Sequence, residues 1–131
     1  MPIRSKDLPP ELRKRLKLAD KPRIRQPRRG VMNGLEKKYA AQLEAERLVG
    51  LVQWYGFEAM TLRLPGGVRY TPDFVVVDEN GLTFREVKGH RRDGGIVRLK
   101  VAAGSFPAFQ FWLVEYVQAR WRVTEVMGDI Q

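Results

Sequence analysis

The stretch from Arg69 to Gly89, RYTPDFVVVDENGLTFREVKG, decides the expected fold. It holds two apolar runs rich in β-branched residues, 74–77 and 82–87, which flank the turn-forming cluster 78–81. Two such runs around a short loop that contains Asn-Gly are typical of a β-hairpin. We therefore predict a hairpin here and build the rest of the domain around it.

A symmetric turn also fixes which residues face each other. It places Val75 opposite Phe84 and Asp73 opposite Glu86, with the Cβ atoms of each pair about 4.5–5.5 Å apart. Two carboxylates so placed repel each other unless a cation compensates their charge. Lys88 follows Glu86 by two residues, so the period of a strand puts it on the same face. Oxygen ligands at this spacing suit Mg²⁺ or Mn²⁺. The alternative is a simple ion pair between Glu86 and Lys88 on an exposed strand, which leaves Asp73 unexplained.

These residues make the stretch resemble the PD-(D/E)XK nuclease superfamily. Pro72-Asp73 corresponds to the PD element, and Glu86-Val87-Lys88 corresponds to the (D/E)XK element. The resemblance looks closest to a small family of phage and prophage proteins related to endonuclease I-type Holliday junction resolvases. It implies Mg²⁺, with Mn²⁺ possible, bound by Asp73, Glu86 and the Val87 carbonyl. It also implies that Lys88 is catalytic and orients or helps to deprotonate the attacking water.

The first core helix is expected over 33–49, because apolar residues such as Tyr39 and Leu43 recur every four positions. Asn33 followed by Glu36 has the spacing of a capping box, so Glu36 would tie down the helix start. In the resembled family a glutamate of the first helix completes the metal site, and Glu36 matches that position. The two roles do not exclude each other, and we expect Glu36 in the catalytic set.

The other segments complete the expected order of elements. Their expected bounds are a strand over 51–64, a helix over 93–106, a strand over 109–116 and a last strand over 121–127. Trp54, Phe57 and Met60 are expected in the core. The order of helix, three strands, helix and two strands corresponds to the αβββαβ core of the resembled superfamily with one added strand. We expect an α/β, restriction-endonuclease-like fold with a mixed central sheet.

Positive charge is concentrated at the start of the chain. The net charge is +9, and residues 1–30 hold eleven of the 24 Lys and Arg residues but three of the 15 Asp and Glu residues. We predict a basic, flexible arm over 1–30 and one nuclease-like domain over 31–131. Such an arm favours a polyanion, most simply nucleic acid, although a solvated terminus that aids solubility has the same composition. The arginines expected to contact DNA are Arg23, Arg25, Arg28 and Arg29.

Further basic residues follow the motif. His90, Arg91 and Arg92 come directly after it, and we expect them to contact phosphate, although a lone histidine beside a basic pair is more often a surface residue. Lys100 lies in the expected second helix and matches a lysine that recurs in the resembled family. It would contact a phosphate, or else it is an ordinary solvated lysine.

Composition excludes several other classes of protein. There are no cysteines, which excludes disulfides and thiolate metal sites and fits a reducing cytoplasm. No run approaches the roughly 18 apolar residues of a membrane span. We therefore expect a cytoplasmic protein without a membrane partner, in the bacterial host cytoplasm if a phage encodes it.

The expected function is a Mg²⁺-dependent DNA endonuclease of phage or prophage origin that acts on branched or structured DNA. A homodimer would suit a junction, in which two symmetric strands must be cut. Two alternatives remain. One is a non-catalytic DNA-binding protein with a nuclease-like fold, and the other is a basic phage assembly protein.

Overall fold

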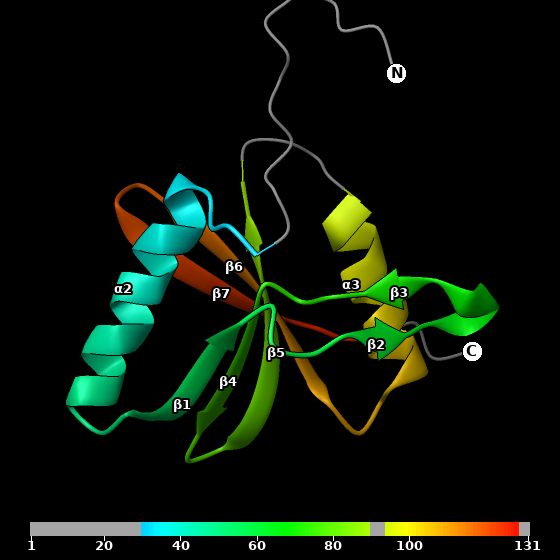
Figure 1. The fold of residues 1–131 in the computed structure, drawn as a ribbon, viewed down its shortest axis with the longest axis horizontal. Coiled ribbons are helices and arrows are strands. Elements are labelled where there is room, and N and C mark those ends of the chain that lie inside the picture. Colours follow the sequence, from blue (N-terminus) through cyan, green and yellow to red (C-terminus); the bar gives the residue numbers. More distant parts are fainter. Residues whose placement is uncertain (1–29, 90–93, 129–131) are drawn as a thin grey trace, which may run out of the picture.

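The computed structural model describes residues 30–89 and 94–128. The described chain forms a mixed five-stranded sheet, two helices and a small two-stranded sheet (Figure 1). In chain order the elements are α2 (Gly34–Leu48), β1 (Val52–Phe57), β2 (Leu62–Arg63), the 3₁₀ turn η2 (Pro65–Gly67), β3 (Arg69–Tyr70), β4 (Phe74–Asp78), β5 (Gly81–Lys88), α3 (Gly94–Ser105), β6 (Gln110–Val117) and β7 (Arg120–Val126).

The large sheet has the strand order β1-β4-β5-β6-β7. β5 and β6 run parallel, and the other neighbouring strands run antiparallel. The predicted α/β class with a mixed sheet is therefore confirmed. The hairpin register is confirmed as well, because Val75 pairs with Phe84 and the turn closes at Asp78 and Gly81.

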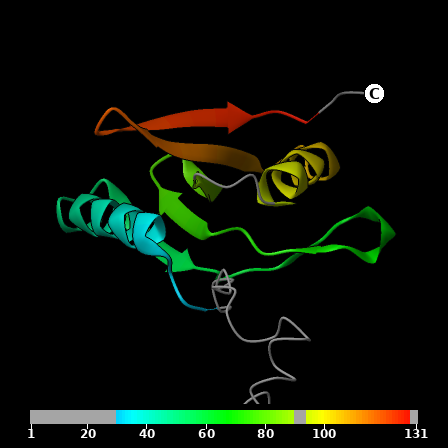
Figure 2. The same ribbon diagram turned by 90° about the horizontal axis from the view of Figure 1, so that it is seen from above.

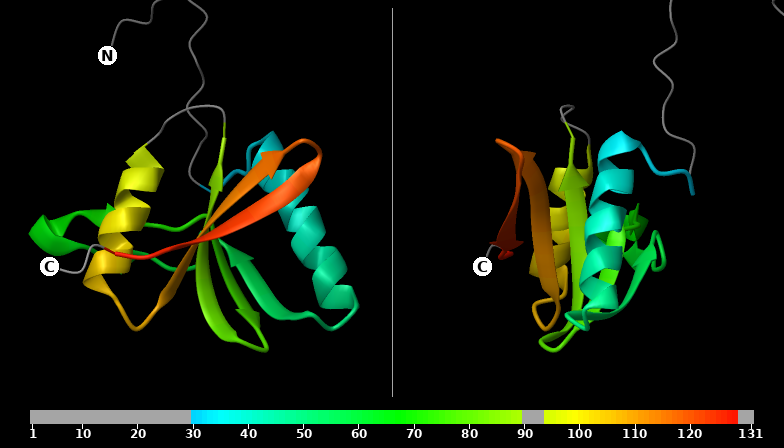
Figure 3. Two further views of the ribbon diagram at one scale, coloured as in Figure 1. Left: turned by 180° about the vertical axis from the view of Figure 1, so that it is seen from behind. Right: turned by 90° about the vertical axis from the view of Figure 1, so that its left-hand side faces the viewer.

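Each face of the large sheet carries a hydrophobic core under one helix. Figure 2 shows the two helices on opposite sides of the sheet. Alternate residues of each strand point to opposite faces. Val75 and Phe84 therefore pack with Leu99 of α3, whereas Val76 and Val87 pack on the α2 side. Figure 3 gives the same arrangement from behind and, on the right, with α2 in front of the sheet.

Helix α2 begins and ends where its sequence predicts. Asn33 is the N-cap, and the reciprocal bonds of a capping box with Glu36 are present. Tyr39 and Leu43 are buried against the sheet. Gly50 has a φ of +85°, a conformation that glycine adopts at low cost after a helix. The start of α2 is therefore fixed by local chemistry, and this matters for the site described below.

The predicted strand over 51–64 is confirmed only as far as Phe57, because the chain leaves the large sheet after that residue. Glu58 has a φ of +48°, which breaks the extended conformation. The chain then forms the small antiparallel hairpin of β2 and β3, which we call the wing (residues 62–70). The wing extends away from the large sheet (Figure 1 and Figure 2).

Two aromatic and apolar residues of this region lie outside the core. Trp54 is 48% exposed and Met60 is 43% exposed, so their predicted burial is wrong. β1 is an edge strand, and the Trp54 ring lies over Gly56, where an added Cβ would come within 2.7 Å of the ring. Phe57 is partly buried in the α2-side core, as predicted.

Helix α3 buries the apolar side that its sequence predicts. Leu99 and Ala103 are buried, and Phe106 packs against the same cluster. Neither helix of the described ranges is long and apolar enough to span a membrane.

Candidate active site

Three carboxylates come together at one end of the large sheet. Asp73 directly precedes β4, Glu86 lies near the end of β5, and Glu36 lies in the first turn of α2. Glu86 and Glu36 both raise the pKa of Asp73 through their negative charge, and Glu36 does so through a side-chain hydrogen bond as well. The structure therefore brings together the three acidic residues that the sequence singles out.

Asp73 has a strongly shifted pKa. The pKa of its carboxyl is raised from 3.8 to about 9, mainly by burial and next by the charge of Glu86. The Val87 amide opposes the shift, because it donates a hydrogen bond of 2.8 Å to Asp73 Oδ2. Burial and a neighbouring carboxylate both favour the protonated form of a carboxyl, and carboxyls shifted in this way are concentrated at functional sites.

Glu86 is held by a residue that the sequence analysis missed. Its side chain is 6% exposed, and Tyr70 donates a hydrogen bond of 2.6 Å from its hydroxyl to Glu86 Oε2. Tyr70 is itself 2% exposed and belongs to the α3-side core. The tyrosine fixes the direction of the carboxylate. Its place in β3, paired with Leu62, could not be read from the motif.

Glu36 takes part in both the helix cap and the cluster. Glu36 Oε1 accepts a hydrogen bond of 2.9 Å from the Asn33 amide, and the Glu36 amide donates one of 2.8 Å to Asn33 Oδ1. The residue is 7% exposed. The capping role expected for Glu36 is therefore confirmed, and the same carboxyl interacts with Asp73.

Lys88 forms its ion pair with a residue of another strand. The sequence places it beside Asp73 and Glu86, whereas its Nζ lies 3.4 Å from Glu115 Oε2. Glu115 is the register partner of Lys88 in β6 and also binds Arg122 at 3.2 Å. Burial alone would raise the pKa of Glu115, but hydrogen bonds from Arg122 and Lys88 lower it overall. Lys88 is thus positioned by β6 at the end of the strand that carries Glu86.

The residues fit a magnesium ion in their chemistry, although they are not arranged as a closed cage. Within 30–89 and 94–128, no group of three or more His, Cys, Asp or Glu side chains is arranged to hold a metal ion. Mg²⁺ usually binds one or two carboxylates and keeps several waters and substrate oxygens. Asp73 and Glu86 supply such a pair, and the raised pKa of Asp73 reflects its burial and the charge of Glu86 beside it.

Only some of the other predicted site residues lie in the part of the chain that the structure describes. Lys100 is exposed on α3. Val87 contributes its amide to Asp73 and buries its side chain under α2. The remaining predicted DNA contacts lie outside the described residues; they are Arg23, Arg25, Arg28, Arg29, His90, Arg91 and Arg92.

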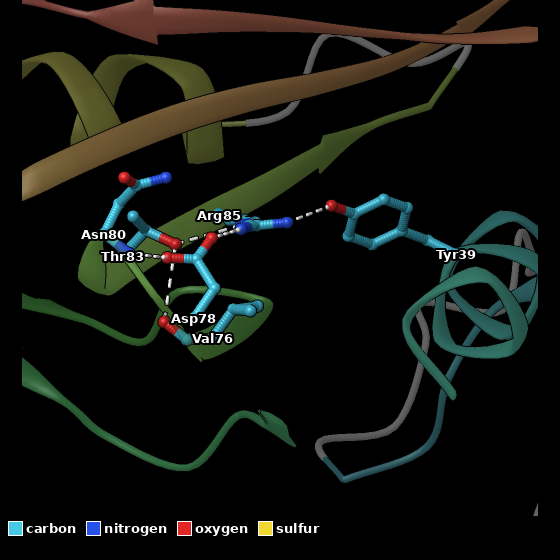
Figure 4. A network of polar contacts seen from close by, with 6 residues as sticks. All are labelled: Tyr39, Val76, Asp78, Asn80, Thr83 and Arg85. Atoms are coloured by element: carbon cyan, nitrogen blue, oxygen red, sulfur yellow. Dashed lines mark hydrogen bonds and ion pairs between the residues drawn. The ribbon is translucent and has the colours of Figure 1, made fainter. Parts of the chain in front are cut away.

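A second polar network, centred on Arg85, lies on the α2 face (Figure 4). Arg85 is 4% exposed and donates to Tyr39 at 2.7 Å and to Thr83 at 3.0 Å. It also lies 3.4 Å from Asp78 Oδ2 and stacks over the Trp112 ring. The network borders a cavity of about 460 Å³. Because Arg85 is fully engaged by these groups, we assign it to stability and not to the carboxylate cluster.

The raised pKa of Asp73 predicts a pH-dependent stability for the metal-free protein. Between pH 3.8 and about 9 the folded state keeps a proton that the unfolded chain releases. The free energy of unfolding should therefore fall as the pH rises through this window. Urea titrations in EDTA at several pH values should reveal the slope, and Asp73→Asn should reduce it. An identical slope in the variant would show that Asp73 titrates normally.

Comparisons of the chain with protein-family models, with curated proteins and with solved structures found no match. A function therefore has to be inferred from the site residues and their surroundings.

Proposed function

We propose that this protein is a metal-dependent DNA endonuclease of phage or prophage origin that cuts branched or structured DNA. One observation carries the proposal. Asp73 and Glu86 converge at the end of the central hairpin, and their proximity and burial raise the pKa of Asp73 to about 9. Such perturbed carboxyls cluster at functional sites. In the motif Pro72-Asp73…Glu86-Val87-Lys88 they also match the PD-(D/E)XK pattern.

Asp73 and Glu86 would hold a Mg²⁺ ion, with Glu36 and the Val87 carbonyl as further ligands. When bound, Mg²⁺ lowers the pKa of a bound water and neutralises charge on the phosphate. Tyr70 keeps the Glu86 carboxylate in place through its hydrogen bond. The Val87 amide does the same for Asp73.

Lys88 has a separate role in the proposed reaction. Glu115 holds its ammonium group on the strand that carries Glu86. A fixed positive charge there stabilises the negative charge that develops on the phosphate in the transition state. The same ammonium group also orients the attacking water.

A cleavage assay tests the proposal directly. Labelled four-way junction, flap, linear duplex and single-stranded DNA are incubated with the full chain in Mg²⁺, in Mn²⁺ or in EDTA. We expect metal-dependent cutting, with the junction or flap preferred. A junction preference would also favour a homodimer, since two symmetric strands must be cut. No cutting of any substrate in either metal would overturn the proposal.

A non-catalytic DNA-binding protein is the second candidate. It is favoured by the open arrangement of the cluster, in which no group of three described acidic or histidine side chains is ready to hold a metal. This candidate predicts salt-sensitive binding to the same four DNA substrates without any cutting.

Removal of the Tyr70 hydroxyl should weaken catalysis without unfolding the protein. In Tyr70→Phe the ring still fills the core, but Glu86 loses the hydrogen bond from this hydroxyl. Loss of such an orienting bond typically costs about 10–100-fold in metal affinity or activity. Cleavage rates over a Mg²⁺ titration measure the effect. Tyr55→Phe, which removes another tyrosine-to-glutamate bond at Glu44, is the matched control and should cut normally.

A further inference from the structure

The wing has two chemically different faces. Its inner face pairs Leu62 with Tyr70, and both side chains are buried in the α3-side core. Its outer face pairs Arg63 with Arg69, and both side chains are exposed. The inner face therefore anchors the wing to the domain, and the outer face presents two guanidinium groups to solvent.

The arginine pair is unfavourable for the protein alone. Directly opposed residues of an antiparallel pair lie about 4.5–5.5 Å apart at Cβ, and like charges there are destabilising. The ion pairs found within the described residues involve neither Arg63 nor Arg69. An external anion would relieve this repulsion, so the outer face has the charge of a binding surface.

The wing is continuous with the proposed active site. Arg69 precedes Tyr70, whose hydroxyl binds Glu86. The hydroxyls of Thr61 and Thr71 lie 2.8 Å apart and join the two wing strands at their base. Asp73 follows two residues after Thr71. A long substrate that occupies the carboxylate cluster would therefore extend toward the wing.

The tip of the wing is free of large side chains. Gly66 and Gly67 both have a φ of +79°, which glycine tolerates and other residues adopt only with strain. A backbone without side chains at this point permits close approach to a polymer. Val68, next to the tip, is 47% exposed.

We propose that the outer face of the wing binds the phosphate backbone of duplex DNA that flanks the cleavage site. The inference rests on the proposed function, since the nucleic acid is the substrate of that reaction. Duplex DNA carries one negative charge per about 1.7 Å of its axis. That density suits two guanidinium groups on neighbouring strands, and Arg63 and Arg69 each bind a phosphate. This duplex arm lies on the wing side of the carboxylate cluster.

The salt dependence of DNA binding tests the arginines. Binding of a labelled duplex is measured in EDTA over a range of salt concentrations, so that no cleavage occurs. Each lost phosphate contact should reduce the slope of log affinity against log salt by about 0.9. Arg63→Gln and Arg69→Gln should each show this reduction, and the double variant about twice as much. Arg47→Gln removes the same charge from an arginine already paired with Glu44 and should keep the wild-type slope.

A cross-link tests the position of the DNA. The chain has no cysteine, so Val68→Cys and Glu79→Cys each offer one attachment point for a photo-cross-linker. Glu79 is exposed in the turn at the far end of the β4–β5 hairpin. We expect cross-links to duplex DNA from position 68 and none from position 79. Absence of cross-links at position 68, or wild-type salt slopes in both arginine variants, would overturn the wing proposal.

These experiments distinguish failure of the wing proposal from failure of the nuclease proposal. Cross-linking and altered slopes without any metal-dependent cutting would retain the wing as a DNA contact and reject the enzyme. Cutting with neither effect would retain the enzyme and reject the wing. A wild-type chain that does not bind DNA at all would reject both.

Discussion

Glu86→Gln should lower the rate of metal-dependent DNA cleavage about a thousandfold. The variant keeps an oxygen that can accept the Tyr70 hydrogen bond, but it loses the charge that would hold the metal ion. A metal ion contributes several kcal/mol to transition-state stabilisation, and about 4 kcal/mol corresponds to three powers of ten in rate. Single-turnover cleavage of the preferred substrate in Mg²⁺ measures the loss.

The variant should remain folded and bind DNA. Glu86→Gln removes a negative charge that raises the pKa of Asp73, so the free energy of unfolding should stay the same or rise. Glu79→Gln is the matched control, because Glu79 is an exposed glutamate at the other end of the same hairpin. We expect it to cut at the wild-type rate. If Glu86→Gln cuts as fast as this control, the carboxylate pair is not the active site.

Phe84→Ala should reduce the free energy of unfolding by about 3–5 kcal/mol. Phe84 is 1% exposed, and its ring contacts two other aromatic rings. Its ring centroid is 5.2 Å from that of Phe111 and 5.7 Å from that of Phe109. Removing the ring leaves a cavity between β5 and α3. Since domains of this size have about 5–15 kcal/mol of stability in total, the loss is a large share.

Chemical denaturation monitored by circular dichroism measures this loss. Leu82→Ala is the matched control, because Leu82 lies two residues earlier on the same face of β5 and is 39% exposed. It should lose less than a third as much stability as Phe84→Ala. Equal losses in the two variants would mean that Phe84 is not the centre of the α3-side core.

Features that depend on neighbouring residues were predictable from the sequence. The hairpin register follows from a period of two and a short turn, which leave one arrangement that buries Val75 and Phe84 together. The capping box follows from the three-residue spacing of Asn33 and Glu36. The convergence of Asp73 with Glu86 follows in turn from the register.

Features that depend on distant partners were not predictable. The ion pair of Lys88 with Glu115 requires the parallel pairing of β5 with β6, which no local pattern specifies. Tyr70 reaches Glu86 because the chain leaves the large sheet at Glu58, which has a positive φ, and then returns through the wing. Trp54 fits a buried strand by residue type, and only its position on an edge strand exposes it.

The central position of the β4–β5 hairpin has a consequence for the motions of the protein. β4 is hydrogen-bonded to β1 on one side and to β5 on the other, and β5 is likewise bordered by β4 and β6. Local opening starts at chain ends, loops and sheet edges, whereas central strands open only with the cooperative unit to which they belong. The strands that position Asp73 and Glu86 therefore cannot fray while the sheet persists. The two carboxylates can therefore be separated by loss of strand pairing only when the whole domain unfolds.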